Sequence, residues 1–306
     1  MLIAKTIIEV EQLTDVDVIF IGDIDNNKTR NYLATLKTLS NICNSYKFPE
    51  KQRGLKTLKR TIFVHDLLKN YKKHYTYIYL ANFHVSIIHH ILSRLDFDNI
   101  HTFDDGTNNF NKKSVMYTMK PTPFIKSILH RISGRIFHWE DVLDLTSKHY
   151  TIFKNKSNII PETNYIDLSL ISSCNGESTS SERGTLNIFA GTVYSDAVSS
   201  KVPKSELIDA LARFITNYKI DVYIPHPRDE VRYFENVNTL VTDKVAEEEI
   251  LSLIQKGYSI NLYGFSSTVQ FNLSSLPQVK NFALNSPILK PAFNEVLDVD
   301  FITVEI

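Results

Sequence analysis

The 306-residue sequence predicts an α/β protein made of two doubly wound units, each with a parallel sheet between helices. Short runs of β-branched and aromatic residues alternate with amphipathic helical stretches along most of the chain. Most runs are apolar at nearly every position, as expected of strands that are buried on both faces. A polar, serine-rich segment interrupts this alternation near the middle, and the length suits two domains of roughly 100–200 residues.

The apolar runs give the predicted strands in chain order. Before the serine-rich segment they are Val18–Gly22, Thr61–Val64, Thr76–Leu80, Asn99–Phe103 and Tyr150–Phe153. After it they are Leu186–Ala190, Ile220–Ile224, Tyr258–Tyr263 and Lys280–Leu284. Spacing close to the 3.6-residue period predicts the helices between them. These are Lys28–Tyr46, Phe83–Leu95, Ser205–Tyr218, Glu247–Lys256 and the shorter Val269–Leu273.

The serine-rich segment sets the predicted domain boundary. We expect a first α/β domain over residues 1–171, a linker over 172–184 and a second α/β domain over 185–306. Parallel sheets of this class bind ligands beyond the carboxyl ends of their strands, commonly in a cleft between domains. Residues that directly follow a predicted strand are therefore the first candidates for a site.

Charge and composition exclude several classes of protein. The 34 Lys and Arg balance the 34 Asp and Glu, so we expect no nucleic-acid partner, although the basic residues are concentrated in the first half. The two cysteines, Cys43 and Cys174, cannot build a disulfide framework or a four-thiolate zinc site. No apolar run approaches the length of a membrane span, and Lys5 and Glu9 interrupt any signal-peptide core. We therefore expect a cytoplasmic location.

The first candidate site follows the predicted strand Asn99–Phe103. Asp104 and Asp105 are adjacent carboxylates, and their repulsion in a partly buried setting would raise the pKa of one of them and make it a general base. The alternative is a plain turn, because Asp105-Gly106 is a common turn dipeptide.

Two further candidates follow strands of the second half. Pro225 and Pro227 hold His226 in extended backbone, which favours an imidazole that points into a cleft. Ser266 and Ser267 follow a glycine at the start of a predicted helix, where hydroxyls and free N–H groups can bind an anion or simply cap the helix. A carboxylate, a rigid histidine and a serine-rich helix start together suit the displacement of a phosphate leaving group from a sugar.

The three motifs also resemble a known family. Asp104-Asp105-Gly106, His226-Pro227 and Ser266-Ser267, in this order, resemble the three motifs of bacterial sialyltransferases. The separation of about forty residues between His226 and Ser266, together with the chain length, is most similar to family 52 of the glycosyltransferases. This family contains the α-2,3-sialyltransferases of lipooligosaccharide and capsule.

The resemblance implies a glycosyltransferase-B fold, in which two Rossmann-like domains face a central cleft. Asp104 would be the general base for the acceptor galactose hydroxyl, with Asp105 and Gly106 in secondary roles. His226 would protonate or stabilise the departing CMP phosphate, which Ser266 and Ser267 would also bind. Further residues are implied in nucleoside or donor binding. They are Gly191, Thr192, Pro227 and one of Glu247 and Glu248.

The sequence thus predicts an inverting sialyltransferase that moves sialic acid from CMP-sialic acid to a terminal galactose of a bacterial lipooligosaccharide or capsule. Direct attack by the acceptor inverts the anomeric carbon, and a monophosphate leaving group has less need of a metal than a diphosphate. We therefore expect no metal and no cofactor other than the donor substrate. A homodimer is kept as a candidate assembly.

Four alternatives stay open at this point. A related transferase could use another sugar nucleotide. A metal-dependent transferase would need an Asp-x-Asp motif, and the chain has four of these in unrelated contexts, of which Asp23-Ile-Asp25 is the best placed. A serine hydrolase could use Ser266, His226 and Asp104, although Thr268 replaces the second glycine of a nucleophile elbow. The fourth alternative is a nucleotide-binding module without catalysis.

One feature does not belong to these motifs. Basic residues from Lys112 to Arg135 overlap the apolar positions Phe124–Ile132, which gives an amphipathic basic helix able to rest on an anionic membrane. A plain surface helix is the alternative. The basic stretch Lys51–Lys73 would strengthen a face that contacts the inner membrane if the two stretches are neighbours in space.

Overall fold

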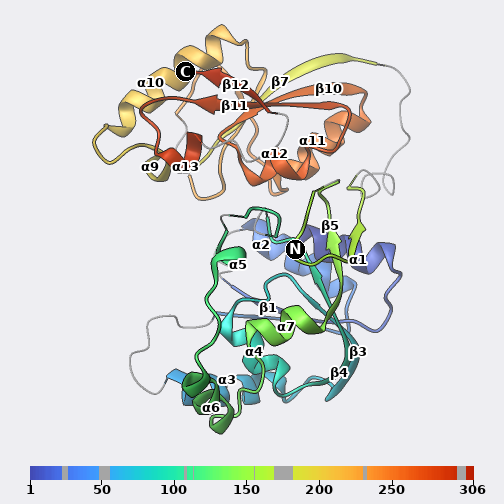
Figure 1. Cartoon of the computed structure of the whole chain (residues 1–306). Coiled ribbons are helices and arrows are strands. Elements are labelled where there is room, and N and C mark those ends of the chain that lie inside the picture. Colours follow the sequence, from blue (N-terminus) through green and yellow to red (C-terminus); the bar gives the residue numbers. More distant parts are fainter. Residues whose placement is uncertain are drawn as a thin grey trace. The chain divides into compact units, whose positions relative to one another are not determined.

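A computed structural model describes the chain except for residues 23–26, 48–55, 107–108, 113, 155, 169–181, 230–232 and 295–300 (Figure 1). The chain divides into two compact units, Met1–Ile166 and Asp167–Ile306. The predicted boundary at residue 171 and most of the predicted linker lie outside the described residues, and Gly184 already begins a strand. Every pair of neighbouring strands in the three described sheets is parallel.

The first unit contains two sheets. Its strands are β1 (Asp17–Ile21), β2 (Ile42–Tyr46), β3 (His74–Leu80), β4 (Asp96–Phe103), β5 (Thr146–Thr151) and β6 (Thr163–Tyr165). Its helices are α1 (Leu2–Val10), α2 (Asn27–Thr38), α3 (Lys56–Leu68), α4 (Ser86–Leu92), α5 (Val115–Thr118), α6 (Phe124–Ile132) and α7 (Trp139–Leu145). β1 pairs with β2, and the second sheet has the order β3-β4-β5-β6.

β4 is the central feature of the first unit. Its first half is partly exposed, whereas its last four residues are all buried. Ile100 is completely buried and belongs to a hydrophobic cluster with Leu80, Leu92 and Val142, which come from β3, α4 and α7. The strand therefore leads the chain into the interior of the unit, and the Asp-Asp-Gly motif begins where it ends.

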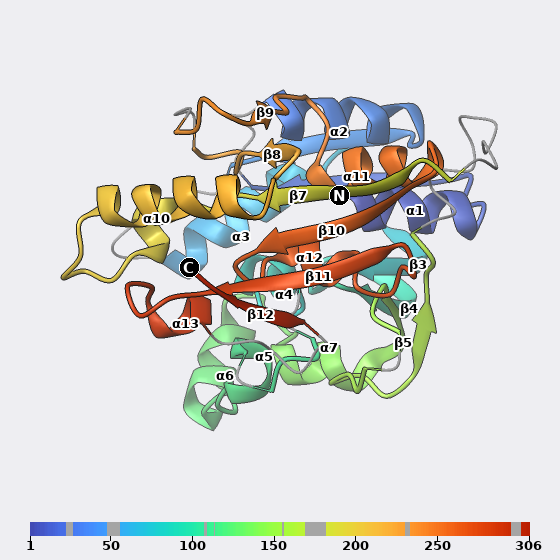
Figure 2. The same cartoon turned by 90° about the horizontal axis from the view of Figure 1, so that it is seen from above.

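The second unit is built on one six-stranded sheet. Its strands are β7 (Gly184–Ala190), β8 (Val222–Ile224), β9 (Asn238–Thr239), β10 (Tyr258–Gly264), β11 (Val279–Asn285) and β12 (Ile302–Glu305). Its helices are α9 (Tyr194–Ala197), α10 (Lys204–Asn217), α11 (Ala246–Gln255), α12 (Thr268–Asn272) and α13 (Pro291–Asn294). The strand order is β12-β11-β10-β7-β8-β9, as Figure 2 shows from above. This is the Rossmann order, and its direction reverses between β7 and β10.

Helices cover both faces of this sheet. Alternate residues of a strand point to opposite faces, so Phe189 and Ile188 of β7 enter two different hydrophobic clusters. Phe189 packs with Phe214 of α10 on one face. Ile188 shares its cluster with Ile250 of α11 on the other face. This two-sided burial explains why the strands of this unit are apolar at nearly every position.

The predicted alternation of strands and helices is confirmed, with two errors in the first unit. Thr61–Val64 was expected to be a strand but lies in α3, where Val64 is fully buried against Ile87 and Ile91 while Ile62 is 55% exposed. The predicted helix Lys28–Tyr46 ends at Thr38, and its last five residues form β2. None of the described helices is both long enough and apolar enough to cross a bilayer.

Candidate active site

The strand register of the second unit brings three predicted segments to one edge of its sheet. Ala190 of β7 pairs with Ile224 of β8, and Phe189 pairs with Tyr263 of β10. The three strands therefore end at the same level, at the point where the strand order reverses. The segments that follow them carry Gly191 and Thr192, then Pro225, His226 and Pro227, and lastly Ser266 and Ser267.

Gly191 lies where the backbone passes close to two buried tyrosines. Its N–H donates to the carbonyl of Ile224 at 2.9 Å, which ties the end of β7 to the end of β8. A Cβ atom at this position would lie 2.8 Å from the hydroxyl of Tyr223 and 3.1 Å from that of Tyr194. These hydroxyls are 3.0 Å apart, and burial raises the pKa of Tyr223 to about 12, so its hydroxyl is protonated at neutral pH. Only glycine fits this position without moving the pair.

His226 is held in one ring orientation by its own loop. The backbone N–H of Arg228 donates to Nδ1 of His226 at 3.1 Å. Because Nδ1 accepts this bond, the neutral ring carries its proton on Nε2, which is then a hydrogen-bond donor. His226 is half-buried and Pro227 is exposed. Arg228 also reaches Asp196 of α9 at 3.5 Å, an exposed contact of small energetic weight.

Ser266 has two properties that are unusual for a structural serine. Its φ is +50°, in the left-handed region that costs a non-glycine residue of order 1 kcal/mol. Its Oγ is buried and makes no hydrogen bond to any described residue. A buried hydroxyl without a partner in a strained turn is a candidate ligand-binding group. A serine nucleophile would need a base within hydrogen-bond reach, so the missing partner also counts against the hydrolase alternative.

Gln270, which the sequence did not single out, fixes the turn that carries the two serines. Its side chain is fully buried, and Nε2 donates to the carbonyls of Leu262 on β10 and Phe282 on β11, at 3.2 and 2.9 Å. Its Oε1 accepts from the backbone N–H of Ser267 at 3.2 Å. A Cβ atom on Gly264 would lie 2.7 Å from this Oε1. The feature of the sequence that could have identified Gln270 is a polar residue on the buried face of a short helix.

The two glutamates predicted near the nucleoside lie in the first turn of α11. Glu247 is buried, and its Oε1 accepts from Nδ2 of Asn272 at 2.7 Å. Asn272 is the last residue of α12, so this bond links Glu247 to the far end of the helix that the serine turn begins. Glu248 is half-buried, and no described contact distinguishes it as a ligand.

Asp104 in the first unit is buried within a hydrogen-bond network. Its side chain is 0% exposed, and Oδ1 lies 2.9 Å from Nε2 of His149. Its Oδ2 accepts from Oγ1 of Thr151 at 2.7 Å and from the backbone N–H of Ile152 at 2.8 Å. The other ring nitrogen of His149 lies 2.8 Å from Oγ1 of Thr102. Three donors from β5 and the residue after it therefore fix the carboxylate.

Asp105 has the opposite environment. It is exposed, and one of its oxygens accepts a hydrogen bond from Nδ2 of Asn82. Gly106 follows with a φ of +65°, a left-handed turn that explains the glycine of this motif. The pair thus divides into an internal carboxylate, Asp104, and a solvent-facing one, Asp105. Adjacency in the sequence alone does not predict this division.

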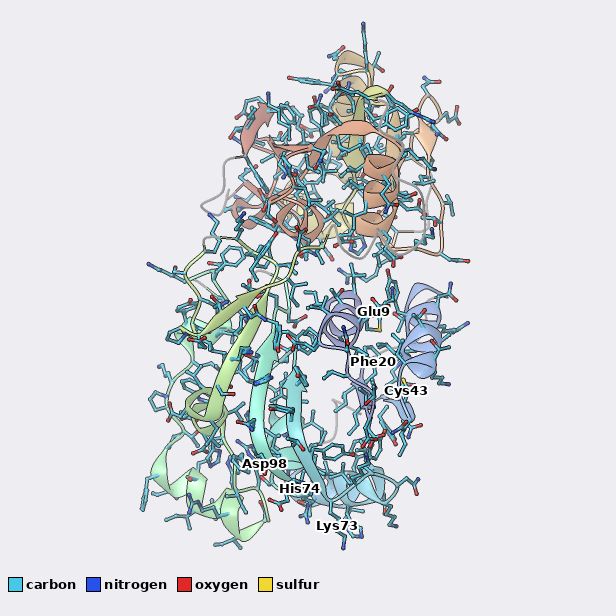
Figure 3. The ribbon with its side chains drawn as sticks, turned by 90° about the vertical axis from the view of Figure 1, so that its right-hand side faces the viewer. Glu9, Phe20, Cys43, Lys73, His74 and Asp98 are labelled. Carbon is cyan, nitrogen blue, oxygen red and sulfur yellow. The ribbon has the colours of Figure 1, made fainter. Side chains whose placement is uncertain are left out.

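Two further acid–base pairs of the first unit lie within the described residues. His74 and Asp98 lie together at 3.1 Å on β3 and β4, and Figure 3 labels both. Asp15 pairs with Lys72. Asp23, Asp25, Asp298 and Asp300 lie outside the described residues. Among the described residues, no group of three or more His, Cys, Asp or Glu side chains could hold a metal ion.

The chain is similar to proteins of known activity. It is 28% identical over 228 residues to the CMP-N-acetylneuraminate:beta-galactoside alpha-2,3-sialyltransferase of Pasteurella multocida, which covers 74% of this chain and 70% of that protein. It is 24% identical to the N-acetyllactosaminide alpha-2,3-sialyltransferase of Haemophilus influenzae, over 91% of this chain and 86% of that protein. A Neisseria meningitidis protein of the latter name is 27% identical over 68% of this chain and 54% of its own length.

The sequence profile of Glycosyltransferase family 52 matches residues 14–287, which include all three motifs. The resemblance inferred from Asp104-Asp105-Gly106, His226-Pro227 and Ser266-Ser267 is thereby confirmed. Because the match spans most of both units, the chain is a glycosyltransferase that belongs to family 52.

Proposed function

We propose that this protein transfers sialic acid from CMP-sialic acid to a terminal galactose of a bacterial surface glycan, with inversion at the anomeric carbon. The observation that carries the proposal is the convergence of Gly191, His226 and Ser266 at the reversal of strand order in the second unit. The names of the relatives supply the donor and the acceptor.

The donor would bind in the second unit. Breaking the bond between the anomeric carbon and the phosphate oxygen leaves negative charge on CMP, and donors aimed at that charge stabilise the transition state. His226 offers Nε2–H, because Nδ1 is occupied by Arg228. Ser266 offers a hydroxyl that no described residue uses. Glu247, rather than Glu248, is our choice for the nucleoside, because its side chain contacts Asn272 of α12, the helix that begins directly after the two serines.

The acceptor would bind in the first unit, at the Asp104–Asp105 pair. The resemblance implies that Asp104 is the general base. The three protein donors around Asp104 favour a different division of labour, in which Asp105 takes the proton of the galactose hydroxyl and Asp104 fixes the turn that presents it. We propose this division, and variants of the two residues distinguish it from the implied one.

The remaining features are proposed on the same basis. The two units would face each other in a glycosyltransferase-B arrangement, so that both groups of residues meet one donor and one acceptor. The reaction would need no metal, since CMP leaves as a monophosphate and cationic or hydroxyl groups can stabilise it. The enzyme would act in the cytoplasm, where it would meet CMP-sialic acid.

The test is the release of CMP from CMP-sialic acid, with and without lactose as a soluble acceptor. The wild type should release CMP and form sialyl-lactose at a rate that EDTA does not change. His226→Ala should lower kcat/KM by about 10²-fold, the usual effect of removing one donor to a developing anion. Arg228→Ala keeps the backbone N–H that orients His226 and is the matched control.

Three outcomes would count against the proposal. Turnover with another sugar nucleotide but not with CMP-sialic acid would support the related transferase instead. A loss of activity in EDTA would indicate a metal. A His226→Ala protein with unchanged turnover would remove His226 from the phosphate site.

A further inference from the structure

Asn82 in the first unit points its side-chain amide at a carboxylate of the Asp-Asp-Gly motif. Its Nδ2 donates a hydrogen bond to Oδ2 of Asp105. Its Oδ1 is shielded from solvent and accepts no hydrogen bond from any described residue. Within the described part of the chain, the hydrogen bonding of this side chain is therefore confined to Asp105, and none of it serves the backbone of the unit.

This orientation costs free energy that a purely structural asparagine would avoid. An amide oxygen that is buried without a donor loses its hydration and gains no bond in exchange. Rotation of the side chain toward solvent would restore the hydration but would break the bond to Asp105. By contrast, both polar atoms of the Asn294 side chain bond the backbone of Ser286 in the second unit. The orientation of Asn82 is therefore explained by Asp105 and not by the needs of its own turn.

The pairing of β3 with β4 brings Asn82 and Asp105 together. Leu80, the last residue of β3, pairs with Thr102 of β4, so the two strands end within one residue of each other (Figure 1). Asn82 follows Leu80 by two residues, and Asp105 follows Thr102 by three. Asn82 thus lies at the carboxyl edge of a parallel sheet, where proteins of this fold class bind their ligands.

The turn that carries Asn82 is anchored on both sides. Leu80 and Phe83, which precede and follow it, are buried in the same hydrophobic cluster. Nε2 of His89 on α4 lies 2.7 Å from the carbonyl oxygen of Phe83, and since a carbonyl only accepts, Nε2 carries the proton. Burial lowers the pKa of His89 to about 4, so this ring is neutral at neutral pH. The side chain of Asn82 therefore extends from a fixed backbone.

The group that Asn82 offers to Asp105 is uncharged. A Lys or Arg in its place would neutralise the carboxylate, whereas an amide fixes the orientation and leaves the negative charge in place. His84 is half-buried nearby, and burial lowers its pKa although the charge of Asp105 opposes this effect. The His84 ring is therefore neutral at neutral pH and does not neutralise the carboxylate either. An oriented carboxylate that keeps its charge is what proton removal from a hydroxyl needs.

We propose that Asn82 is a positioning residue, which holds the carboxylate of Asp105 in the orientation that takes the proton of the acceptor hydroxyl. This inference rests on the proposed function, in which Asp105 is the proton acceptor. Because Asn82 acts through Asp105 and lies in the first unit, its replacement should change the rate of transfer and leave donor binding unchanged.

The test is a double-mutant cycle of Asn82→Ala and Asp105→Asn, with transfer to lactose as the readout. Asn82→Ala alone should lower kcat by about 10- to 100-fold, the effect of a catalytic group displaced by about 1 Å, with little change in KM for lactose. The double variant should be as active as Asp105→Asn alone, because the effects of residues that act as a unit do not add.

Asn41→Ala is the matched control. Nδ2 of Asn41 donates to Oδ1 of Asp15 at 2.6 Å, so this variant also removes an amide-to-carboxylate bond from the first unit. It should leave kcat unchanged. The affinity of Asn82→Ala for CMP and its thermal midpoint should equal those of Asn41→Ala, which separates a loss of positioning from a loss of folded protein.

Four results would overturn the inference. Unchanged turnover of Asn82→Ala would show that Asp105 does not need the amide, and a raised KM with unchanged kcat would make Asn82 an acceptor-binding residue only. A double variant that loses the product of the two single effects would show that Asn82 acts independently of Asp105. Full activity of Asp105→Asn would remove the group through which Asn82 acts.

The cycle compares ratios of rates, so it can be run with whichever sugar nucleotide the wild type uses. Turnover of another donor in place of CMP-sialic acid would therefore contradict the proposed function and leave the role of Asn82 to be decided by the cycle.

Discussion

Asp104 and Asp105 are neighbours in the sequence, yet their carboxylates face different surroundings. Three protein donors fix the carboxylate of Asp104 in place, which suits a residue that supports a turn. An exposed carboxylate can approach a substrate hydroxyl directly. At the scale of single residues, the mechanism therefore depends on which of the two contacts the acceptor.

Replacing each aspartate by asparagine distinguishes an effect on the free energy of unfolding from an effect on catalysis. Asp104→Asn should lower the free energy of unfolding by about 1–3 kcal/mol, because an amide cannot accept from His149, Thr151 and Ile152 together. Asp105→Asn should change it by no more than about 0.5 kcal/mol. Thermal or urea unfolding measures both.

Turnover of CMP-sialic acid with lactose gives the second readout. If Asp105 is the proton acceptor, Asp105→Asn should lower kcat by about 10²-fold or more while the fold is unchanged. If Asp105→Asn is fully active and Asp104→Asn is inactive, the proposed division is wrong and Asp104 is the general base.

At the scale of elements, short segments position the candidate groups. α12 has only five residues, and the buried amide of Gln270 joins it to β10, β11 and the N–H of Ser267. This side chain connects the middle of the sheet to the strained turn at Ser266. The turn therefore depends on a residue that does not itself face a ligand in our proposal.

Gln270→Met keeps the approximate volume of the side chain and removes its hydrogen bonds. The free energy of unfolding should fall by about 2–4 kcal/mol, since two carbonyls and one N–H lose their partner in a buried site. KM for CMP-sialic acid should rise more than kcat falls. Gln278→Met, at an exposed position, is the control, and an equal effect of both substitutions would contradict the role given to Gln270.

Sequence periodicity predicted the elements of the second unit better than those of the first. Strands covered on both faces leave continuous apolar runs, and β7, β10 and β11 were all found in this way. β2 has the sequence Ile-Cys-Asn-Ser-Tyr with every residue partly exposed, so it leaves no apolar run. Thr61–Val64 is β-branched and apolar, but burial on one side of α3 outweighs its local preference for a strand.

The candidate site could be predicted only in part. Residues that directly follow strands were found because parallel sheets place them at one edge. The hydrogen-bond partners of these residues could not be predicted. His149 and Thr151 reach Asp104 because β4 pairs with β5, and a single sequence does not reveal that pairing. Gln270 was missed for the same reason, because its hydrogen bonds go to two strands of the sheet.

At the scale of the whole molecule, the histidines are unevenly distributed. Nine of the ten lie in the first unit, and His226 is the other one. Burial lowers the pKa of His89 to about 4 and that of His90 to about 3, with Arg135 adding to both effects. These rings are neutral in the folded unit and would take up protons on unfolding below their ordinary pKa of about 6.5.

The first unit should therefore lose stability as the pH falls from about 6.5 to about 4. In that range the unfolded chain binds more protons than the folded one, so acid favours unfolding. Thermal unfolding followed by circular dichroism at a series of pH values should show one transition moving down in temperature ahead of the other. His90→Gln should make this shift smaller, and His65→Gln, at an exposed position, should not. Transitions that move together at every pH would contradict the prediction.

The reversal of strand order also determines at what point of translation the sheet of the second unit can be completed. β7 is the first strand of this sheet to be synthesised, yet it lies between β8 and β10. Before β10 is made, the partial sheet contains β7, β8 and β9, and one edge of β7 is unpaired. Nascent chains stalled before Tyr258 would carry His226 but lack β10 and the serine turn that follows it. Under the proposed function, the second unit should therefore bind CMP-sialic acid only after β10 and the serine turn have been synthesised.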